Sequence, residues 1–127
     1  MARLDAIGLV TADMKQSVRF YRLLGLEVPD ATEDHLDITL PSGMRIMLDT
    51  VELAKQLDPE GRTPAGHAFA LAFRCASARE VDEAYARVKK AGFTGKKEPF
   101  DAFWGQRYAT VLDPDGNAVD LSADLPR

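Results

Sequence analysis

The sequence of 127 residues is poor in cysteine, in basic residues and in long apolar runs. Its single cysteine, Cys75, cannot form an internal disulfide, so a packed core must hold the fold, and a reducing cytoplasm is the expected location. No apolar run approaches the roughly 20 residues that span a bilayer. The opening residues, Met-Ala-Arg-Leu-Asp, also lack the apolar stretch of a signal peptide. We therefore expect no membrane partner.

Positive charge is in deficit, because the formal net charge is −4 and the isoelectric point lies near 5.1. Binding to a phosphate backbone needs a basic face, so nucleic acid is excluded as a partner. An acidic surface instead suits neutral or cationic small molecules. The sequence contains no Gly-rich phosphate loop and no Ser-His-Asp pattern, and no histidine adjoins Cys75, so thiol catalysis is not expected.

What the chain has is one order of predicted elements that recurs in its two halves. In the first half, an N-cap at Asp13 and a stop at Gly25 bound a predicted helix over residues 14–24. A strand over 4–10 precedes this helix, and strands over 35–40 and 44–49 and a short helix over 51–57 follow it. Residues 58–66, rich in Pro and Gly, predict a linker. In the second half, Ser77 and Gly92 bound a helix in the same way, and the predicted strand, helix, edge strand and hairpin cover residues 67–75, 78–91, 93–100 and 108–122.

The final hairpin has a distinctive sequence. Its strands, 108–112 and 118–122, flank Asp113-Pro-Asp-Gly116, in which Pro presets φ and Gly tolerates a positive φ. Such a hairpin at the end of a repeated βαβββ unit resembles the vicinal-oxygen-chelate superfamily, which includes glyoxalase I, extradiol dioxygenases, fosfomycin-resistance enzymes and bleomycin-resistance proteins. The resemblance covers nearly the whole chain.

This resemblance implies an α+β fold in which residues 1–127 form a single domain. Two βαβββ modules, about residues 1–57 and about residues 67–127, would form a curved, mixed sheet shaped as a cup, joined by a linker over about residues 58–66. Members of this length usually pair, so we expect a homodimer.

Strand parity divides the predicted strands into two faces. One face is apolar and should pack under the two helices: Ile7, Leu9, Leu36, Ile38, Leu40, Ile46, Leu48, Leu71, Phe73, Cys75, Val119 and Leu121. The opposite face is polar and holds several very small residues: Ala6, Gly8, His35, Asp37, Thr39, Arg45, Met47, Asp49, Ala70, Ala72, Arg74, Tyr108, Thr110, Asp120 and Ser122. This pattern predicts the wall of a cavity, and the alternative is an ordinary solvated sheet face.

The resemblance also implies four positions for metal ligands, one on the first and one on the last strand of each module. In this sequence they fall on Ala6, Met47, Ala70 and Asp120. Alanine has no ligand atom and a thioether prefers soft metals, so we expect neither a metal nor another cofactor. His67 is offset by an odd number of residues from Ala70, and we interpret it as a polar residue that opens its strand.

A metal site that is not inherited is an alternative. His35, Asp37, Asp49 and Asp120 share the polar parity, and carboxylates with an imidazole suit Mg²⁺ or Mn²⁺. Nothing in their spacing places them within coordinating distance of one ion, and a wet sheet face explains them equally well.

Aromatic residues gather in residues 98–106, where Phe100, Phe103 and the only tryptophan, Trp104, precede a strand. A tryptophan in a loop beside glycine offers a flat, rigid stacking surface with one N–H donor. Similarity to bleomycin-resistance-like proteins implies that Trp104, Gly105 and Arg107 border a ligand groove. The alternative is that Trp104 covers the core or a subunit contact.

The leading hypothesis is a metal-independent binding protein of the bleomycin-resistance type, which sequesters planar or aromatic compounds, cationic ones included. Its ligand-binding residues would be an aromatic platform, acidic groups and rim residues: Trp104, Phe103, Asp37, Asp49, Asp120, Arg107, Tyr108, Met47 and His35. The alternative is a lyase or isomerase of the superfamily, with Asp120 or His35 as general base or with the non-inherited metal site. A third possibility is an interaction module whose cup is filled by side chains. The sequence leaves open whether the chain is an enzyme.

Overall fold

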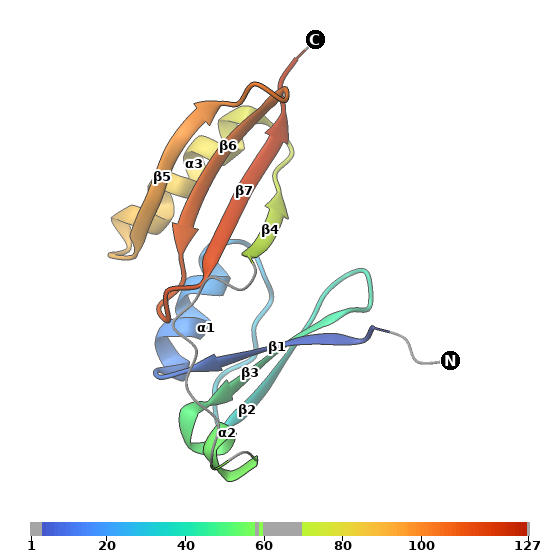
Figure 1. Ribbon diagram of the computed structural model, residues 1–127, viewed down its shortest axis with the longest axis vertical. Coiled ribbons are helices and arrows are strands. Elements are labelled where there is room, and N and C mark those ends of the chain that lie inside the picture. Colours follow the sequence, from blue (N-terminus) through green and yellow to red (C-terminus); the bar gives the residue numbers. More distant parts are fainter. Residues whose placement is uncertain (1–3, 58, 60–69, 127) are drawn as a thin grey trace. The chain divides into compact units, whose positions relative to one another are not determined.

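The computed structural model describes residues 4–57, 59 and 70–126, and the chain divides into two compact units, Met1–Pro64 and Ala65–Arg127 (Figure 1). The described residues form helices and two separate sheets, which confirms the predicted α+β class. Apart from residue 59, the predicted linker over 58–66 lies outside the described residues, as do His67 and the two residues after it. Each unit is described by itself.

Unit 1 contains a sheet of strand order β1-β3-β2. Its strands are β1 (Ala6–Thr11), β2 (His35–Thr39) and β3 (Arg45–Thr50). β1 runs parallel to β3, and β2 runs antiparallel to it. The helices of this unit are α1 (Met14–Leu23) and α2 (Val51–Leu57), and α2 has the predicted bounds.

The predicted capping residues bound α1. The Asp13 carboxylate accepts a hydrogen bond from the backbone N–H of Gln16, 3.2 Å away, and Gly25 has a φ of 93°, which ends the helix. Met14, Val18 and Tyr21 follow helical spacing and are buried, whereas Leu24 is only half-buried. Phe20 is also fully buried, because the buried surface of α1 is wider than a single row of residues.

Unit 2 contains a sheet of order β4-β7-β6-β5, one face of which is covered by α3 (Ala78–Lys90) (Figure 1). The strands are β4 (Ala70–Arg74), β5 (Thr94–Asp101), β6 (Gln106–Leu112) and β7 (Ala118–Asp124). Ser77 caps α3 through the N–H of Glu80, and Gly92 follows its end with a φ of 95°. β5 is an edge strand, as predicted, and its pairing with β6 is irregular.

The turn between β6 and β7 is built around a buried carboxylate. Asp113 accepts hydrogen bonds from the backbone N–H groups of Asp115 and Asn117, and from the Asn117 side-chain amide, at 2.9, 2.8 and 2.8 Å. Gly116 has a φ of 84°, which a residue with a Cβ adopts only with strain. The predicted Asp-Pro-Asp-Gly turn is therefore confirmed and is held by its first residue.

Burial follows the predicted strand parity. Most positions of the apolar face are buried: Leu9, Leu36, Ile38, Ile46, Leu48, Leu71, Val119 and Leu121. The exceptions lie near strand ends and are only half-buried: Ile7, Leu40, Phe73 and Cys75. Within residues 4–57, 59 and 70–126, no helix has the length and apolar character that crossing a bilayer requires.

Candidate ligand-binding site

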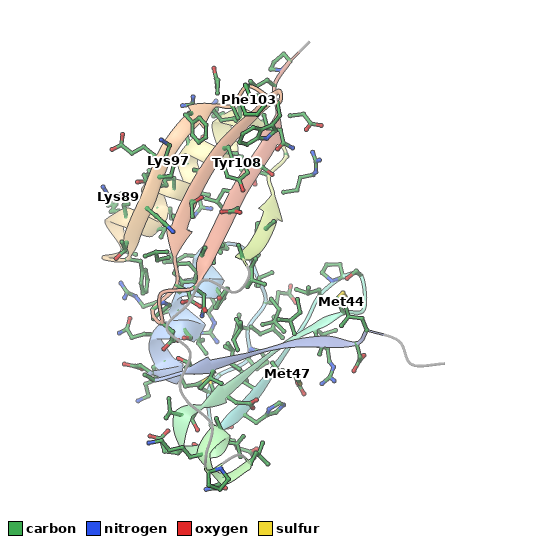
Figure 2. All side chains as sticks on the ribbon, in the orientation of Figure 1. Met44, Met47, Lys89, Lys97, Phe103 and Tyr108 are labelled. Carbon is green, nitrogen blue, oxygen red and sulfur yellow. The ribbon has the colours of Figure 1, made fainter. Side chains whose placement is uncertain are left out.

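The sheet of unit 2 has a face turned away from α3, which we call the distal face. Alternate residues of β6 and β7 point to it, because Ala109, Val111, Val119 and Leu121 between them are buried on the other side. The distal face therefore carries Ala72, Tyr108, Thr110, Asp120 and Ser122, which lie beside one another in the register of the sheet. Figure 2 shows the Tyr108 and Lys97 side chains on this side of the sheet.

The loop between β5 and β6 presents two aromatic residues at its tip. The carbonyl of Ala102 accepts a hydrogen bond from the N–H of Gly105 at 3.0 Å, and the N–H of Ala102 donates to the carbonyl of Gln106 at 2.7 Å. Gly105 has a φ of 90°, as tight hairpin loops of this kind require. Phe103 and Trp104 occupy the central positions of this turn and are 97% and 49% exposed.

Four rings form what we call the aromatic cluster: Phe100, Phe103, Trp104 and Tyr108. The centroid of Trp104 lies 5.0 Å from that of Phe103, 5.3 Å from that of Tyr108 and 6.3 Å from that of Phe100. All these pairs meet edge to face, the favourable arrangement for ring quadrupoles. The Lys97 ammonium lies 5.0 Å from the centroid of Phe100, so the cluster already has one cation at its edge.

Asp120 is the carboxylate of the distal face. It accepts hydrogen bonds from the hydroxyl groups of Tyr108 at 2.5 Å and Thr110 at 2.8 Å. Partial burial, and secondly the contact with Asp120, raise the pKa of Tyr108 to about 12, so the phenol stays a neutral donor. On the β4 side, the small residue Ala72 pairs with Asp120 in the register. The two hydroxyl groups leave lone pairs of the Asp120 carboxylate for another donor.

Arg107, predicted beside this groove, lies on the other face of the sheet. Its guanidinium forms ion pairs with Asp82 of α3 at 2.9 Å and with Asp101 at 3.0 Å, and these two carboxylates raise its pKa further. Strand parity gives the reason, because Arg107 directly precedes Tyr108 and neighbouring residues of a strand point to opposite faces.

The polar face of unit 1 carries a chain of charged side chains. His35 contacts Asp49 through Nδ1 at 2.5 Å and Asp37 through Nε2 at 3.1 Å. Arg45 contacts Asp37 at 2.9 Å and Asp5 at 2.7 Å. Carboxylates beside both ring nitrogens favour the protonated ring, and the hydrogen bond to Asp49 is the main cause of the raised pKa of His35.

Arg45 and Asp5 were not among the predicted site residues. Arg45 has the same parity as His35 and Asp37, which is the signal that the sequence offered. The position of Asp5 follows only from the register, in which β1 lies beside β3 and brings together residues that are 40 positions apart.

The chain also matches known proteins. The family model of the Glyoxalase/Bleomycin resistance protein/Dioxygenase superfamily matches residues 3–121. The chain belongs to this superfamily. The recognition of the vicinal-oxygen-chelate superfamily from the sequence is thereby confirmed. No curated protein matches the chain significantly.

Solved structures of superfamily members resemble the whole chain. A glyoxalase-related enzyme from Fulvimarina pelagi is 20% identical, with a TM-score of 0.86 over 98% of this chain and 89% of that one. A glyoxalase/bleomycin resistance protein/dioxygenase from Nocardioides is 26% identical, with a TM-score of 0.75 over 98% and 85%. A genomically encoded fosfomycin resistance protein from Listeria monocytogenes is 20% identical, with a TM-score of 0.73 over 97% and 93%. The first and third of these show the fold alone.

The four positions that the resemblance implied for metal ligands carry side chains in this chain that do not suit a divalent ion. In unit 1, Ala6 lies beside Arg45, and Met47 lies between Gly8 and Asp37. In unit 2, Ala70 lies beside Ala118, and only Asp120 brings an oxygen ligand. Within the described ranges, no group of three or more His, Cys, Asp or Glu side chains is placed to hold a metal ion. His35, Asp37 and Asp49 contact one another within unit 1, whereas Asp120 belongs to unit 2, so the alternative site of these four residues stays a hypothesis.

Unit 1 also has a surface depression of about 550 Å³ between the end of α1 and β2. Asp37 is the one predicted site residue that lines it. Arg22, at its rim, is held by the Val28 carbonyl at 2.6 Å and the Asp30 carboxylate at 2.9 Å. Its guanidinium is thus committed to the protein itself.

Proposed function

We propose that this chain binds planar aromatic small molecules, cationic ones included, on the distal face of unit 2 and without a metal ion. The observation that supports this best is the aromatic cluster, in which Trp104 and Phe103 stay exposed beside the carboxylate of Asp120. Monomeric proteins seldom expose grouped large apolar side chains without a use for them. Sequestration of this kind requires neither a nucleophile nor an activated water molecule.

The distal face offers two kinds of contact to such a ligand. Stacking on a ring of the cluster contributes about 0.5–1.5 kcal/mol beyond the area buried. The lone pairs of Asp120 that Tyr108 and Thr110 leave unused would accept an N–H of the ligand, and a charged donor strengthens that bond. Lys97 against Phe100 is a cation–ring contact within the same cluster.

The polar face of unit 1 has a lesser part in the proposal. Asp37 and Asp49 would attract cationic ligands at long range, although His35 and Arg45 offset much of their charge. Met47 and His35 stay predicted lining residues, and a ligand contact for Arg107 requires that its ion pairs with Asp82 and Asp101 open. The homodimer also stays a proposal, which light scattering at several protein concentrations would test.

The first test is calorimetric titration with two planar tricyclic probes of opposite charge, 9-aminoacridine and acridine-9-carboxylate. We expect the cation to bind more tightly, and Trp104→Ala to weaken it by about tenfold because a stacking surface is lost. Asp120→Asn should remove the preference for the cation. Leu57→Ala is the matched control, since Leu57 is another exposed apolar residue but belongs to α2 of unit 1. Equal binding by the wild type and Trp104→Ala, or no binding of either probe, would contradict the proposal.

A second candidate function is catalysis of a superfamily reaction with Asp120 as general base. The half-buried carboxylate, oriented by two hydroxyl groups, supports this candidate. His35 is less suited as a base, because both of its ring nitrogens already contact carboxylates, which favour the protonated ring. Catalysis predicts that Asp120→Asn abolishes turnover and retains binding, whereas sequestration predicts no turnover in the wild type.

A further inference from the structure

We propose that Gln106 is a positioning residue, whose side-chain amide fixes the indole of Trp104 in the orientation that receives a planar ligand. The part that concerns the ligand rests on the proposed function. Gln106 lies at the start of β6, directly after the turn that carries Trp104, and its side chain is on the distal side with Tyr108.

A line of polar contacts holds the indole. The indole N–H of Trp104 donates to Oε1 of Gln106 at 2.9 Å, and Nε2 of Gln106 donates to Oδ1 of Asp124 at 3.2 Å. The other carboxylate oxygen of Asp124 lies 3.2 Å from the Arg74 guanidinium. These contacts run from the hairpin loop across β6 and β7 to β4.

The amide has only one orientation that satisfies both neighbours. An ionised carboxylate accepts and does not donate, so Asp124 binds the NH2 group of Gln106 and turns its oxygen toward Trp104. The indole has a single donor and no acceptor, so it requires that oxygen. Asp124 therefore fixes the amide, and the amide fixes the indole. The ion pair of Asp124 with Arg74 is largely exposed and should matter less.

An indole at the tip of a turn needs such a restraint. The neighbouring rings contact Trp104 only edge to face, and about half of its surface is exposed. A side chain that must first be ordered by the ligand costs affinity, whereas a side chain already held in place does not. Loss of one hydrogen bond of this kind should weaken ligand binding by about three- to tenfold.

The only tryptophan of the chain makes the proposal measurable without any ligand. Tryptophan fluorescence anisotropy of the free protein reports the motion of the Trp104 ring on top of overall tumbling, which the variants share. We expect Gln106→Leu to lower this anisotropy and to weaken the binding of 9-aminoacridine by about three- to tenfold. Gln16→Leu is the matched control, because Gln16 is exposed on α1 and its side chain bonds Arg19.

A double-mutant cycle tests whether Gln106 acts through the indole N–H. Trp104→Phe keeps an aromatic ring but removes the N–H donor. In that background, Gln106→Leu should therefore weaken the binding of 9-aminoacridine by less than about twofold. Asp124→Ala leaves Gln106 in place and frees its amide to rotate, so it should lower the anisotropy as well. Asp124→Asn keeps an acceptor for the Gln106 amide, so its anisotropy should be close to that of the wild type. If Gln106→Leu fails to fold, the Asp124 variants still test whether this amide restrains the indole.

The outcomes separate this inference from the proposed function. Unchanged anisotropy in both Gln106→Leu and Asp124→Ala would overturn the positioning role, whatever the probe does. The same loss of affinity from Gln106→Leu in the Trp104→Phe background would overturn action through the indole. Reduced anisotropy in a protein whose wild type binds neither acridine would support the positioning of Trp104 and contradict the proposed function instead.

Discussion

The polar face of unit 1 and the distal face of unit 2 lie on sheets with the same topological core. In each unit a hairpin ends in a strand that runs parallel to the first strand of the unit, β3 beside β1 and β7 beside β4. The equivalent rows of residues differ in chemistry on the two hairpin strands, while both have a very small residue on the first strand. Unit 1 has Asp37, Met47 and Gly8 where unit 2 has Thr110, Asp120 and Ala72. Topology thus fixes which side chains are neighbours and leaves their chemistry free.

The two faces also treat negative charge in opposite ways. In unit 1, Asp37 and Asp49 contact the cations of His35 and Arg45, so the charges largely offset one another. In unit 2, Asp120 is held by two neutral hydroxyl groups, which orient the carboxylate without neutralising it. A cationic ligand would therefore meet more uncompensated charge at Asp120 than on the polar face of unit 1.

The largest difference between the units should appear in the stability of their hairpin turns. Asp113→Ala removes a buried acceptor from two backbone N–H groups and one amide, and should lower the free energy of unfolding by about 3 kcal/mol. The control is Ser42→Ala in the turn between β2 and β3, where the Ser42 hydroxyl accepts a bond from the N–H of Met44 at 3.4 Å. That change should cost less than about 0.5 kcal/mol in urea denaturation. Equal losses of unfolding free energy from the two substitutions would show that side-chain hydrogen bonds stabilise the two turns equally.

A smaller difference concerns the glycines of the two sheets. Gly95 of β5 lies under the Tyr85 ring of α3, and a Cβ there would overlap the buried ring. Gly95→Ala should therefore destabilise the protein by about 2 kcal/mol in thermal or urea unfolding. Gly8 of β1 is the matched control, because a Cβ there would meet Met47 at an ordinary 3.6 Å. Gly8→Ala should change stability by less than about 0.5 kcal/mol, and a larger loss there than at Gly95 would contradict the packing of α3 on β5.

The linked charged side chains on the polar face of unit 1 should make the stability of the protein depend on pH. Because the pKa of His35 is raised in the fold, its contribution is fully present below the ordinary value of 6.5 and is lost as pH rises through the raised value. The melting temperature of the wild type should fall over that window, and less so in His35→Gln. His67→Gln, at the other histidine of the sequence, is the control. An identical pH profile for the wild type and His35→Gln would contradict a contribution of the protonated His35 ring to stability.

The smallest effect should be spectroscopic and lies in unit 2. An ultraviolet titration should show Tyr108 ionising near pH 12, a step that is absent in Tyr108→Phe. Burial is the larger cause of this pKa, so Asp120→Asn should lower it only part of the way to the ordinary 10. The stability that the neutral phenol provides is lost as pH rises from 10 to about 12. A return to 10 in Asp120→Asn would assign the whole shift to the carboxylate.

Local signals in the sequence predicted much of the fold. Asp13 and Ser77 cap helices, Gly25 and Gly92 end them, and parity placed Tyr108 and Asp120 on one face. These features depend on residues that are near in sequence or on the alternation of a strand, both of which are visible without a structure.

The features that were missed depend on geometry that local patterns do not contain. The contact of Asp5 with Arg45 requires the register between β1 and β3. The bond from Trp104 to Gln106 requires the exact course of the hairpin loop, which Gly105 permits. Arg107 is a different case, because the parity rule that placed Tyr108 on the distal face also placed Arg107 on the other.

The irregular edge strand β5 has a consequence for the protein in solution. Its register shifts twice between Gly95 and Phe100, and this stretch also contains two lysines and Pro99. Such an edge is a poor template for a strand of another molecule, because its hydrogen-bonding groups are out of step and Pro99 offers no N–H. Phe103 and Trp104 therefore lie in the open at the end of an edge, β5, that gives a neighbouring chain no regular strand along which to aggregate.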